Sequence, residues 1–168
     1  MVDEYDSWTG HRVRVRAVTP DDFDAFFADG RDKEAERLNN EVMPPQSPLH
    51  LEQRLKQVPD DKDDNCWLAI ETRAGELVGS VNAHGTNRRH RHFYSGISVF
   101  REARRNGYAS EAVALLLRHY FRELGYHYAI AEVYAFNAPS IAFHERIGFN
   151  AEGRFRESLY TRGATTTS

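Results

Sequence analysis

The stretch Arg104-Arg105-Asn106-Gly107-Tyr108-Ala109 decides how the rest of this chain is interpreted. It stands between an apolar run, residues 96–100, and a strongly amphipathic helical pattern. A strand, a turn with glycine and a helix start leave unpaired backbone N–H groups at the helix N-terminus, where the helix dipole adds about half a positive charge. Such an end binds a phosphate or pyrophosphate through main-chain groups, and Arg101, Arg104 and Arg105 surround it with positive charge.

Composition narrows the class of protein. With 168 residues, of which 40% are hydrophobic, we expect one domain over residues 1–168, with residues 161–168 as a polar tail. A net charge of −3 argues against a general nucleic-acid binder, because affinity for phosphate backbones grows with the number of neutralised phosphates. The single cysteine, Cys66, has no disulfide or CxxC partner, which fits a reducing compartment. Since no run approaches the ~18 apolar residues of a membrane span, we expect a cytoplasmic protein without membrane contact or bound metal.

Hydrophobic periodicity predicts the secondary structure. Strands are expected at residues 12–17, 66–72, 76–83, 91–100, 128–136 and 149–160. Helices are expected from Thr19 to about Gly30, in patches between residues 31 and 59, at residues 109–124 and at residues 139–147. This order predicts an α+β fold with one central mixed, mostly antiparallel sheet flanked by helices.

The element order and two motifs resemble the GNAT superfamily of acyl-CoA-dependent N-acyltransferases over nearly the whole chain. The family's cofactor signature, Gln/Arg-x-x-Gly-x-Gly/Ala, is matched in register by Arg104, Gly107 and Ala109. A second family segment, an Asn followed by a short helix that ends in Gly-Phe, is matched by residues 137–149. The two motifs together, at the proper spacing, make this resemblance specific.

Three further features look most like the branch of Rim-type ribosomal-protein N-terminal acetyltransferases. They are the serine at position 140, the proline-rich segment at residues 43–48 and the ending at residues 152–157. Members of that branch acetylate several kinds of amine, so the acceptor stays open between a small-molecule amine and a protein N-terminus.

The superfamily resemblance implies acetyl-CoA as co-substrate and direct transfer to a primary amine, without a covalent enzyme intermediate. The pyrophosphate would lie on backbone amides at the helix start, and the pantetheine arm would add like a strand to the third antiparallel strand. The implied cofactor-binding residues are Ile97, Ser98, Val99, Arg104, Arg105, Asn106, Gly107, Tyr108, Ala109, Asn137 and Ser140. The thioester would point into the gap between that strand and the strand expected from residue 128.

Asn137, Ser140 and His144 are spaced three and four residues apart, so they share one face of a helix. Many family members carry at position 144 a tyrosine that protonates the leaving sulfur, and here the residue is histidine. Ser140 is therefore a candidate for this proton, with His144 as its rival because imidazoles exist in either protonation form near neutral pH. The alternative is that Asn137 and Ser140 only cap the helix.

The general base is less evident. The branch often carries a glutamate on the third antiparallel strand just before its glycine, but residues 93–96 here read Phe-Tyr-Ser-Gly. A water chain shaped by His84, Glu132 or Tyr94 is a plausible substitute. His84 could equally be a solvated loop residue, and Glu132 could simply pair with a neighbouring arginine.

Two other classes of protein remain as alternatives. The missing tyrosine and glutamate would suit a non-catalytic acyl-CoA-binding or sensing module. The Arg/His run at residues 87–92 beside two aromatic residues would suit nucleic-acid binding, although a charged hairpin loop is the preferred interpretation. Acidic residues that could attract a cationic amine, or simply form a solvated face, are Glu34, Glu36 and Glu41.

The C-terminal residues depart from the family pattern. GNAT folds normally finish with one more strand after the one expected at residues 149–160, whereas residues 161–168 are polar. We therefore expect the usual last strand to be missing. Either the chain is shortened or the open sheet edge is covered by a second copy in a homodimer, since proteins usually hide unpaired edges.

Overall fold

The computed structural model describes residues 7–39, 47–56, 63–156, 159–161 and 164–166. Its contacts divide the chain into two compact units, residues 1–29 with 47–130 and residues 30–46 with 131–168. Each unit is described by itself.

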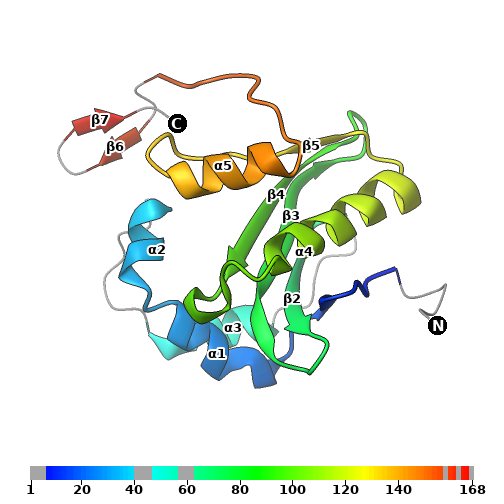
Figure 1. Ribbon diagram of the computed structural model, residues 1–168, viewed down its shortest axis with the longest axis vertical. Coiled ribbons are helices and arrows are strands. Elements are labelled where there is room, and N and C mark those ends of the chain that lie inside the picture. The colour runs from blue at the N-terminus through cyan, green and yellow to red at the C-terminus, as the bar shows by residue number, and fades with distance from the viewer. Residues whose placement is uncertain (1–6, 40–46, 57–62, 157–158, 162–163, 167–168) are drawn as a thin grey trace. The chain divides into compact units, whose positions relative to one another are not determined.

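The first unit is built on a five-stranded sheet in the order β1-β2-β3-β4-β5 (Figure 1). The strands are β1 (Val13–Ala17), β2 (Cys66–Thr72), β3 (Leu77–Asn87), β4 (His92–Val99) and β5 (Tyr128–Ile130). Neighbours from β1 to β4 run antiparallel, and β5 runs parallel to β4. The predicted mixed, mostly antiparallel sheet of an α+β fold is confirmed.

Helices cover both faces of this sheet. They are η1 (Pro20–Asp22), α1 (Phe23–Asp29), α3 (Pro48–Lys56), η2 (Arg101–Ala103) and α4 (Tyr108–Arg118), which continues into the π-helical turn η3 (His119–Glu123). On one face, the Trp67 ring lies 5.1 Å from the Phe26 ring of α1 and 4.0 Å from the Arg54 guanidinium of α3. The opposite face packs against the apolar side of α4.

The core of the first unit lies between α4–η3 and the sheet. Phe93 of β4 is fully buried, and its ring stacks on that of Tyr120 with 4.2 Å between centroids. Tyr126 closes the cluster with an edge contact 5.6 Å from Phe93. Helix α4 buries Ala112, Val113, Leu115 and Leu116, whose three- and four-residue spacing places them on one stripe.

The second unit contains α2 (Lys33–Leu38), α5 (Ala138–Arg146) and a separate hairpin of β6 (Leu159–Thr161) and β7 (Ala164–Thr166). The Asp32 carboxylate caps α2 by accepting hydrogen bonds from the N–H groups of Glu34 and Ala35 at 3.1 and 3.2 Å. Gly148 follows α5 with a left-handed φ of 101°, the usual way a helix ends before a turn.

Several predicted boundaries need correction. The strand expected at residues 128–136 ends at Ile130, and residues 149–156 form no strand. Residues 150–156 are all exposed, so they have no buried face that a strand could present to the sheet. Only β6 falls within the strand expected at residues 149–160. The tail expected to be merely polar contributes β7, which pairs with β6 and not with the five-stranded sheet.

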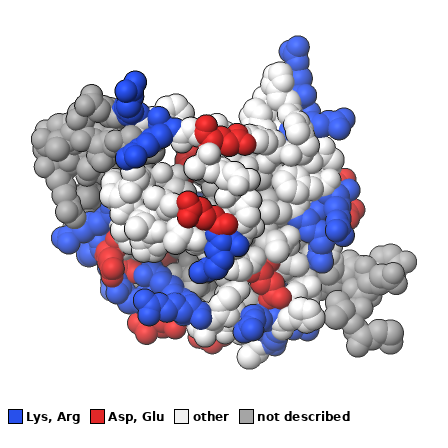
Figure 2. Space-filling view, turned by 45° about the horizontal axis from the view of Figure 1, so that its top comes forward, with Lys and Arg blue, Asp and Glu red and all other residues white. Residues whose placement is uncertain are grey.

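The charges on the face drawn in Figure 2 are mixed, with Lys and Arg interspersed among Asp and Glu. Within the described ranges, no helix has the length and apolar character needed to cross a bilayer.

Candidate active site

The segment between β4 and α4 forms a tight loop with two left-handed residues, Arg105 at φ 66° and Gly107 at φ 79°. Gly107 is the N-cap of α4. A Cβ atom at position 107 would meet Arg12 only at an ordinary 3.7 Å, so conformation and not crowding within the chain requires glycine here. The sequence prediction of a glycine turn at a helix start is confirmed, with the helix beginning at Tyr108.

Side-chain donors form hydrogen bonds with carbonyl groups of this loop. The amide of Asn106 donates to the carbonyl oxygens of Ala103 and Arg104 at 3.0 and 3.2 Å, and the Arg12 guanidinium donates to the Asn106 carbonyl at 3.4 Å. No side chain caps the first turn of α4 in the part of the chain that is described. The N–H groups at the start of α4 therefore remain as donors, and together with the dipole they suit an anion.

β4 has one partly open edge. It pairs with β5 only from His92 to Tyr94, and the last pair joins Tyr94 to Ile130. Along residues 95–99, no described strand pairs with β4 on that side, whereas β3 pairs with it up to Val99 on the other. An open strand edge offers alternating N–H and C=O groups to an extended ligand that carries amides.

Tyr94 stands at the end of the β4–β5 pairing. Its half-buried side chain stacks on the His84 ring with 5.6 Å between centroids and makes an edge contact with His92 at 6.3 Å. The structure thus brings together two of the three residues considered for the water chain. The third, Glu132, lies beyond the end of β5 and is exposed, so the expectation that it lies on a strand is wrong.

In the second unit, Asn137, Ser140 and His144 lie close together along α5, as the spacing predicts. The Asn137 side chain caps the helix, because its Oδ1 accepts the N–H of Ser140 at 3.2 Å while its Nδ2 donates to the Leu38 carbonyl at 3.2 Å. His144 Nδ1 lies 2.8 Å from the Ser140 carbonyl oxygen and 3.4 Å from its hydroxyl. The capping role of Asn137 is therefore real.

Comparison with known proteins decides the family. Residues 12–150 match the Acetyltransferase (GNAT) domain. The chain is 32% identical over 157 residues to the SPbeta prophage-derived uncharacterized N-acetyltransferase YokL of Bacillus subtilis, covering 94% of this chain and 86% of that protein. The chain belongs to the GNAT acetyltransferase family.

Solved structures share the fold. The spermidine N-acetyltransferase from Vibrio cholerae, solved with CoA and spermine, superimposes with a TM-score of 0.82 at 21% identity, covering 94% of this chain and 92% of that one. A GCN5-related N-acetyltransferase from Brucella melitensis gives 0.77 at 25% identity, covering 95% and 74%. This GNAT protein is accordingly an acetyl-CoA-dependent N-acetyltransferase, and acetyl-CoA is its co-substrate.

The sequence prediction missed one residue that supports the loop between β4 and α4. The Glu111 carboxylate, in the first turn of α4, accepts hydrogen bonds from the backbone N–H groups of His11, Arg12 and Val13 at 2.7, 2.7 and 2.9 Å. The only sequence signal was an acidic residue in the first turn of a helix, which is common and does not reveal a partner about a hundred residues away.

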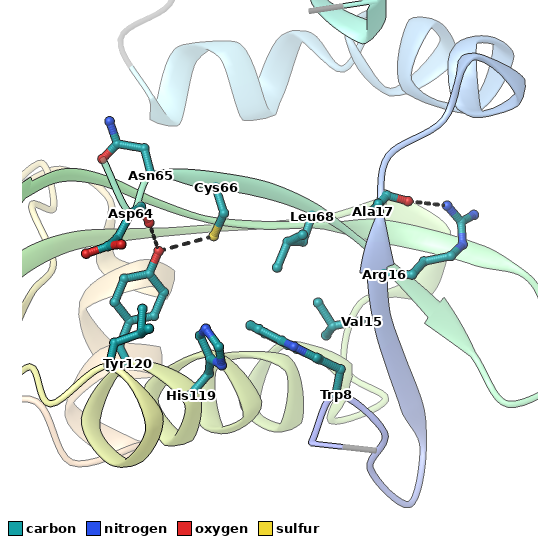
Figure 3. Close-up of a pocket in the computed structure, with 11 residues that line it drawn as sticks. Trp8, Val15, Arg16, Ala17, Asp64, Asn65, Cys66, Leu68, His119 and Tyr120 are labelled. Atoms are coloured by element: carbon teal, nitrogen blue, oxygen red, sulfur yellow. Dashed lines mark hydrogen bonds between the residues drawn. The ribbon is translucent and has the colours of Figure 1, made fainter. Parts of the chain in front are cut away.

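A cavity of about 330 Å³ lies between α4–η3 and the β1–β2 side of the sheet (Figure 3). Trp8, His119 and Tyr120 face Cys66 and Leu68 across it. None of the predicted site residues lines this cavity. Burial raises the pKa of the Cys66 thiol, and a neutral buried thiol is a poor nucleophile, which agrees with acetyl transfer that does not pass through this cysteine.

Some residues of the basic run at 87–92 form contacts within the fold. It forms the end of the β3–β4 hairpin, where Arg88 binds the Asp64 carboxylate through two hydrogen bonds of 2.6 and 2.8 Å. The Asn87 side chain accepts the N–H of His90 at 2.9 Å. These contacts support the hairpin interpretation of this run.

The acidic residues suggested for attracting a cationic amine differ in their surroundings. Glu36 binds Lys33 at 2.9 Å, and Glu34 lies exposed at the start of α2. Glu41 and most of the proline-rich segment at residues 43–48 lie outside the described residues.

Proposed function

We propose that residues 1–168 form one acetyltransferase domain that acetylates a primary amine by direct attack on the thioester, in a complex that holds both substrates. The observation that carries this proposal is the sequence of elements around the end of β4. The open edge at residues 95–99 is followed by a loop that leads directly into the N-terminus of α4 at Gly107. The first feature suits the amides of a pantetheine arm, and the second suits a pyrophosphate.

The residues proposed to hold acetyl-CoA follow from these two features. Backbone groups of Ile97, Ser98 and Val99 would bind the pantetheine arm along the open edge. The N–H groups from Arg105 to Ala109 would bind the pyrophosphate, with the Arg104 and Arg105 side chains adding positive charge. When bound, acetyl-CoA supplies a thioester carbonyl as the electrophile.

The chemistry requires a neutral amine and a proton for the departing sulfur. The amine nitrogen forms the new bond to the acetyl carbon, the carbon–sulfur bond breaks with its electron pair on sulfur, and the nitrogen loses one proton. We assign the proton for sulfur to the Ser140 hydroxyl, with His144 as the alternative donor. Because a carbonyl oxygen only accepts, His144 Nδ1 carries the hydrogen that it shares with Ser140, so His144 could donate to sulfur only from Nε2 of the protonated ring.

The remaining predicted site residues have supporting roles in this proposal. Asn137 would orient the start of α5 through its cap and contact the pantetheine arm. Tyr94 and Glu132 would shape the water around the acceptor amine.

The acceptor class follows from the relatives by analogy alone. Spermidine acetyltransferases occur repeatedly among the similar folds, so polyamines are the first amines to test. The Rim-type features of the sequence make a protein N-terminus the second class.

We also propose that the protein is a cytoplasmic homodimer. A two-stranded hairpin on its own is marginally stable in water, and β6–β7 pairs with no other strand in the described ranges, so a second copy would supply the missing contacts. The free thiol of Cys66 fits the reducing cytoplasm. Sedimentation that finds only monomer at micromolar concentration would contradict the dimer.

Calorimetric titration with acetyl-CoA, followed by an assay of free CoA release with spermidine and other amines, tests the function. Gly107→Glu should abolish micromolar binding, because the side chain brings bulk and negative charge to the anion site. Gly75→Glu is the matched control, since Gly75 also has a left-handed φ, of 90°, and open space around it, but lies in the β2–β3 turn. Equal loss in both variants, or no binding by the wild type, would overturn the proposal.

A further inference from the structure

We propose that His84 is the catalytic residue that accepts the proton from the attacking amine. This inference rests on the proposed function, because it assigns one step of amine acetylation. His84 lies near the end of β3, is exposed, and stands directly opposite Tyr94 of β4. Residues 93–96 of β4, Phe-Tyr-Ser-Gly, offer no carboxylate for this role.

The register between β3 and β4 places four residues on one face of the sheet. His84 pairs with Tyr94, and Asn82 pairs with Gly96. Directly paired residues of antiparallel strands project to the same side, and successive residues alternate. This face is therefore opposite to the one that carries Val81 and Ala83, which are both buried.

Asn82 orients the His84 ring. Its Oδ1 lies 3.1 Å from His84 Nδ1, and because an amide oxygen only accepts, Nδ1 carries the hydrogen. In the neutral ring, Nε2 then keeps the lone pair that a general base needs. A histidine whose other nitrogen is fixed by an oxygen acceptor is the usual arrangement for a base of defined tautomer.

Two glycines let these groups lie close to the strands. A Cβ atom at Gly96 would lie 2.8 Å from Asn82 Nδ2, and one at Gly85 would lie 3.0 Å from the Tyr94 ring. The Asn82 amide therefore lies directly over Gly96, two residues past the last β4–β5 pair. This contact holds the His84–Asn82 pair beside the β4 segment whose outer edge is open.

One proton leaves the amine nitrogen during the transfer, and His84 receives it. As the nitrogen–carbon bond forms, one proton moves from the amine nitrogen to His84 Nε2, directly or through one water, and the imidazole becomes a cation. The electron pair of the broken bond goes to sulfur, which takes the proton that we assign to Ser140. Tyr94 stacks on the His84 ring and can stabilise the cation through its π face.

Other titratable groups lie near His84 and Asn82 and can also affect the pH profile. On β4, the titratable side chains are Tyr94, which stacks on the His84 ring, and His92, which makes an edge contact with Tyr94. The other elements packed against β3 carry Cys66 and Glu71 on β2 and Tyr108, Glu111 and Arg118 on α4.

The test is the pH profile of kcat/KM for spermidine or the best amine found, in wild type and His84→Gln. We expect kcat to fall about 100-fold or more, and the acid limb of the profile to change, because in the variant it reports only the ionisation of the amine. Affinity for acetyl-CoA should stay unchanged. His90→Gln is the matched control, since it removes an exposed imidazole from the same hairpin and should leave both kcat and the profile unchanged. Added imidazole should restore part of the activity of His84→Ala.

An active wild type whose kcat and acid limb survive His84→Gln would overturn this inference alone. A wild type that binds no acetyl-CoA and acetylates no amine would overturn the proposed function with it. Loss of acetyl-CoA affinity in His84→Gln, without rescue of His84→Ala by imidazole, would identify a structural role and also overturn the inference.

Discussion

The Glu111 carboxylate accepts the backbone N–H of Arg12 at 2.7 Å, and this contact joins the first turn of α4 to the start of β1. The N–H groups of His11 and Val13 bind the same carboxylate. In return, the Arg12 side chain reaches the Asn106 carbonyl in the loop before α4. The loop that we assign to the pyrophosphate is therefore held from outside by the N-terminal segment.

Glu111→Ala should weaken both the fold and the binding of acetyl-CoA. Removing a charged acceptor from three N–H groups costs ~2 kcal/mol, and the freed loop would lose its orientation. Thermal unfolding and calorimetric titration measure the two effects. Gly10→Val tests the same contact from the other side, because its Cβ would lie 2.5 Å from Glu111 Cδ. Unchanged affinity in both variants would show that the loop holds its shape without this anchor.

Phe93→Ala should be strongly destabilising. Its ring is fully buried and stacks on Tyr120, so truncation leaves a cavity and costs about 4 kcal/mol. The free energy of unfolding in urea gives the value. Phe155→Ala is the control, because that side chain is 68% exposed and should change stability little. Similar losses in the two variants would contradict the position assigned to Phe93.

Acid should erase the contribution of Arg88 to stability. The hydrogen bond from Arg88, opposed by burial and aided by one from the Tyr126 hydroxyl, lowers the pKa of Asp64 from its usual 3.8 to about 2. Because the folded-state pKa is the lower one, Asp64 stabilises the fold above about pH 4, and this contribution is lost as the pH falls towards 2. Arg88→Gln should therefore lower Tm at pH 6 but hardly at pH 2.

Unfolding curves at a series of pH values check this expectation. Arg89→Gln, a neighbouring exposed arginine, provides the comparison. A Tm difference for Arg88→Gln that persists unchanged at pH 2 would mean that the ion pair with Asp64 does not cause it.

Ser140→Ala should lower kcat by about 100-fold if its hydroxyl protonates the leaving sulfur. The backbone contacts of Ser140 with Asn137 and His144 would survive, because they use its N–H and carbonyl groups. Ser140→Thr keeps a hydroxyl and should retain more activity than alanine. Steady-state kinetics with a fixed amine measure both variants, and full activity of Ser140→Ala would transfer the role to His144.

Local sequence patterns were enough to predict the elements that position the site residues. The turn at Gly107 and the α4 helix were predictable because glycine conformation and apolar spacing act over a few residues. The α5 stripe of Asn137, Ser140 and His144 was predictable for the same reason. The strand expected at residues 149–160 does not form over residues 149–156, since local propensity does not form a strand that has no face to bury.

The sequence by itself determined the order of elements from β1 to α5, the glycine turn before α4 and the GNAT motifs, all of which depend on neighbouring residues. Only the tertiary structure decided which distant groups meet. Glu111 finds its donors at residues 11–13, and Asn82 lies over Gly96, because strand register and helix packing place them there. Register depends on the burial of whole faces and on turn geometry, so a single stretch of chain does not contain it.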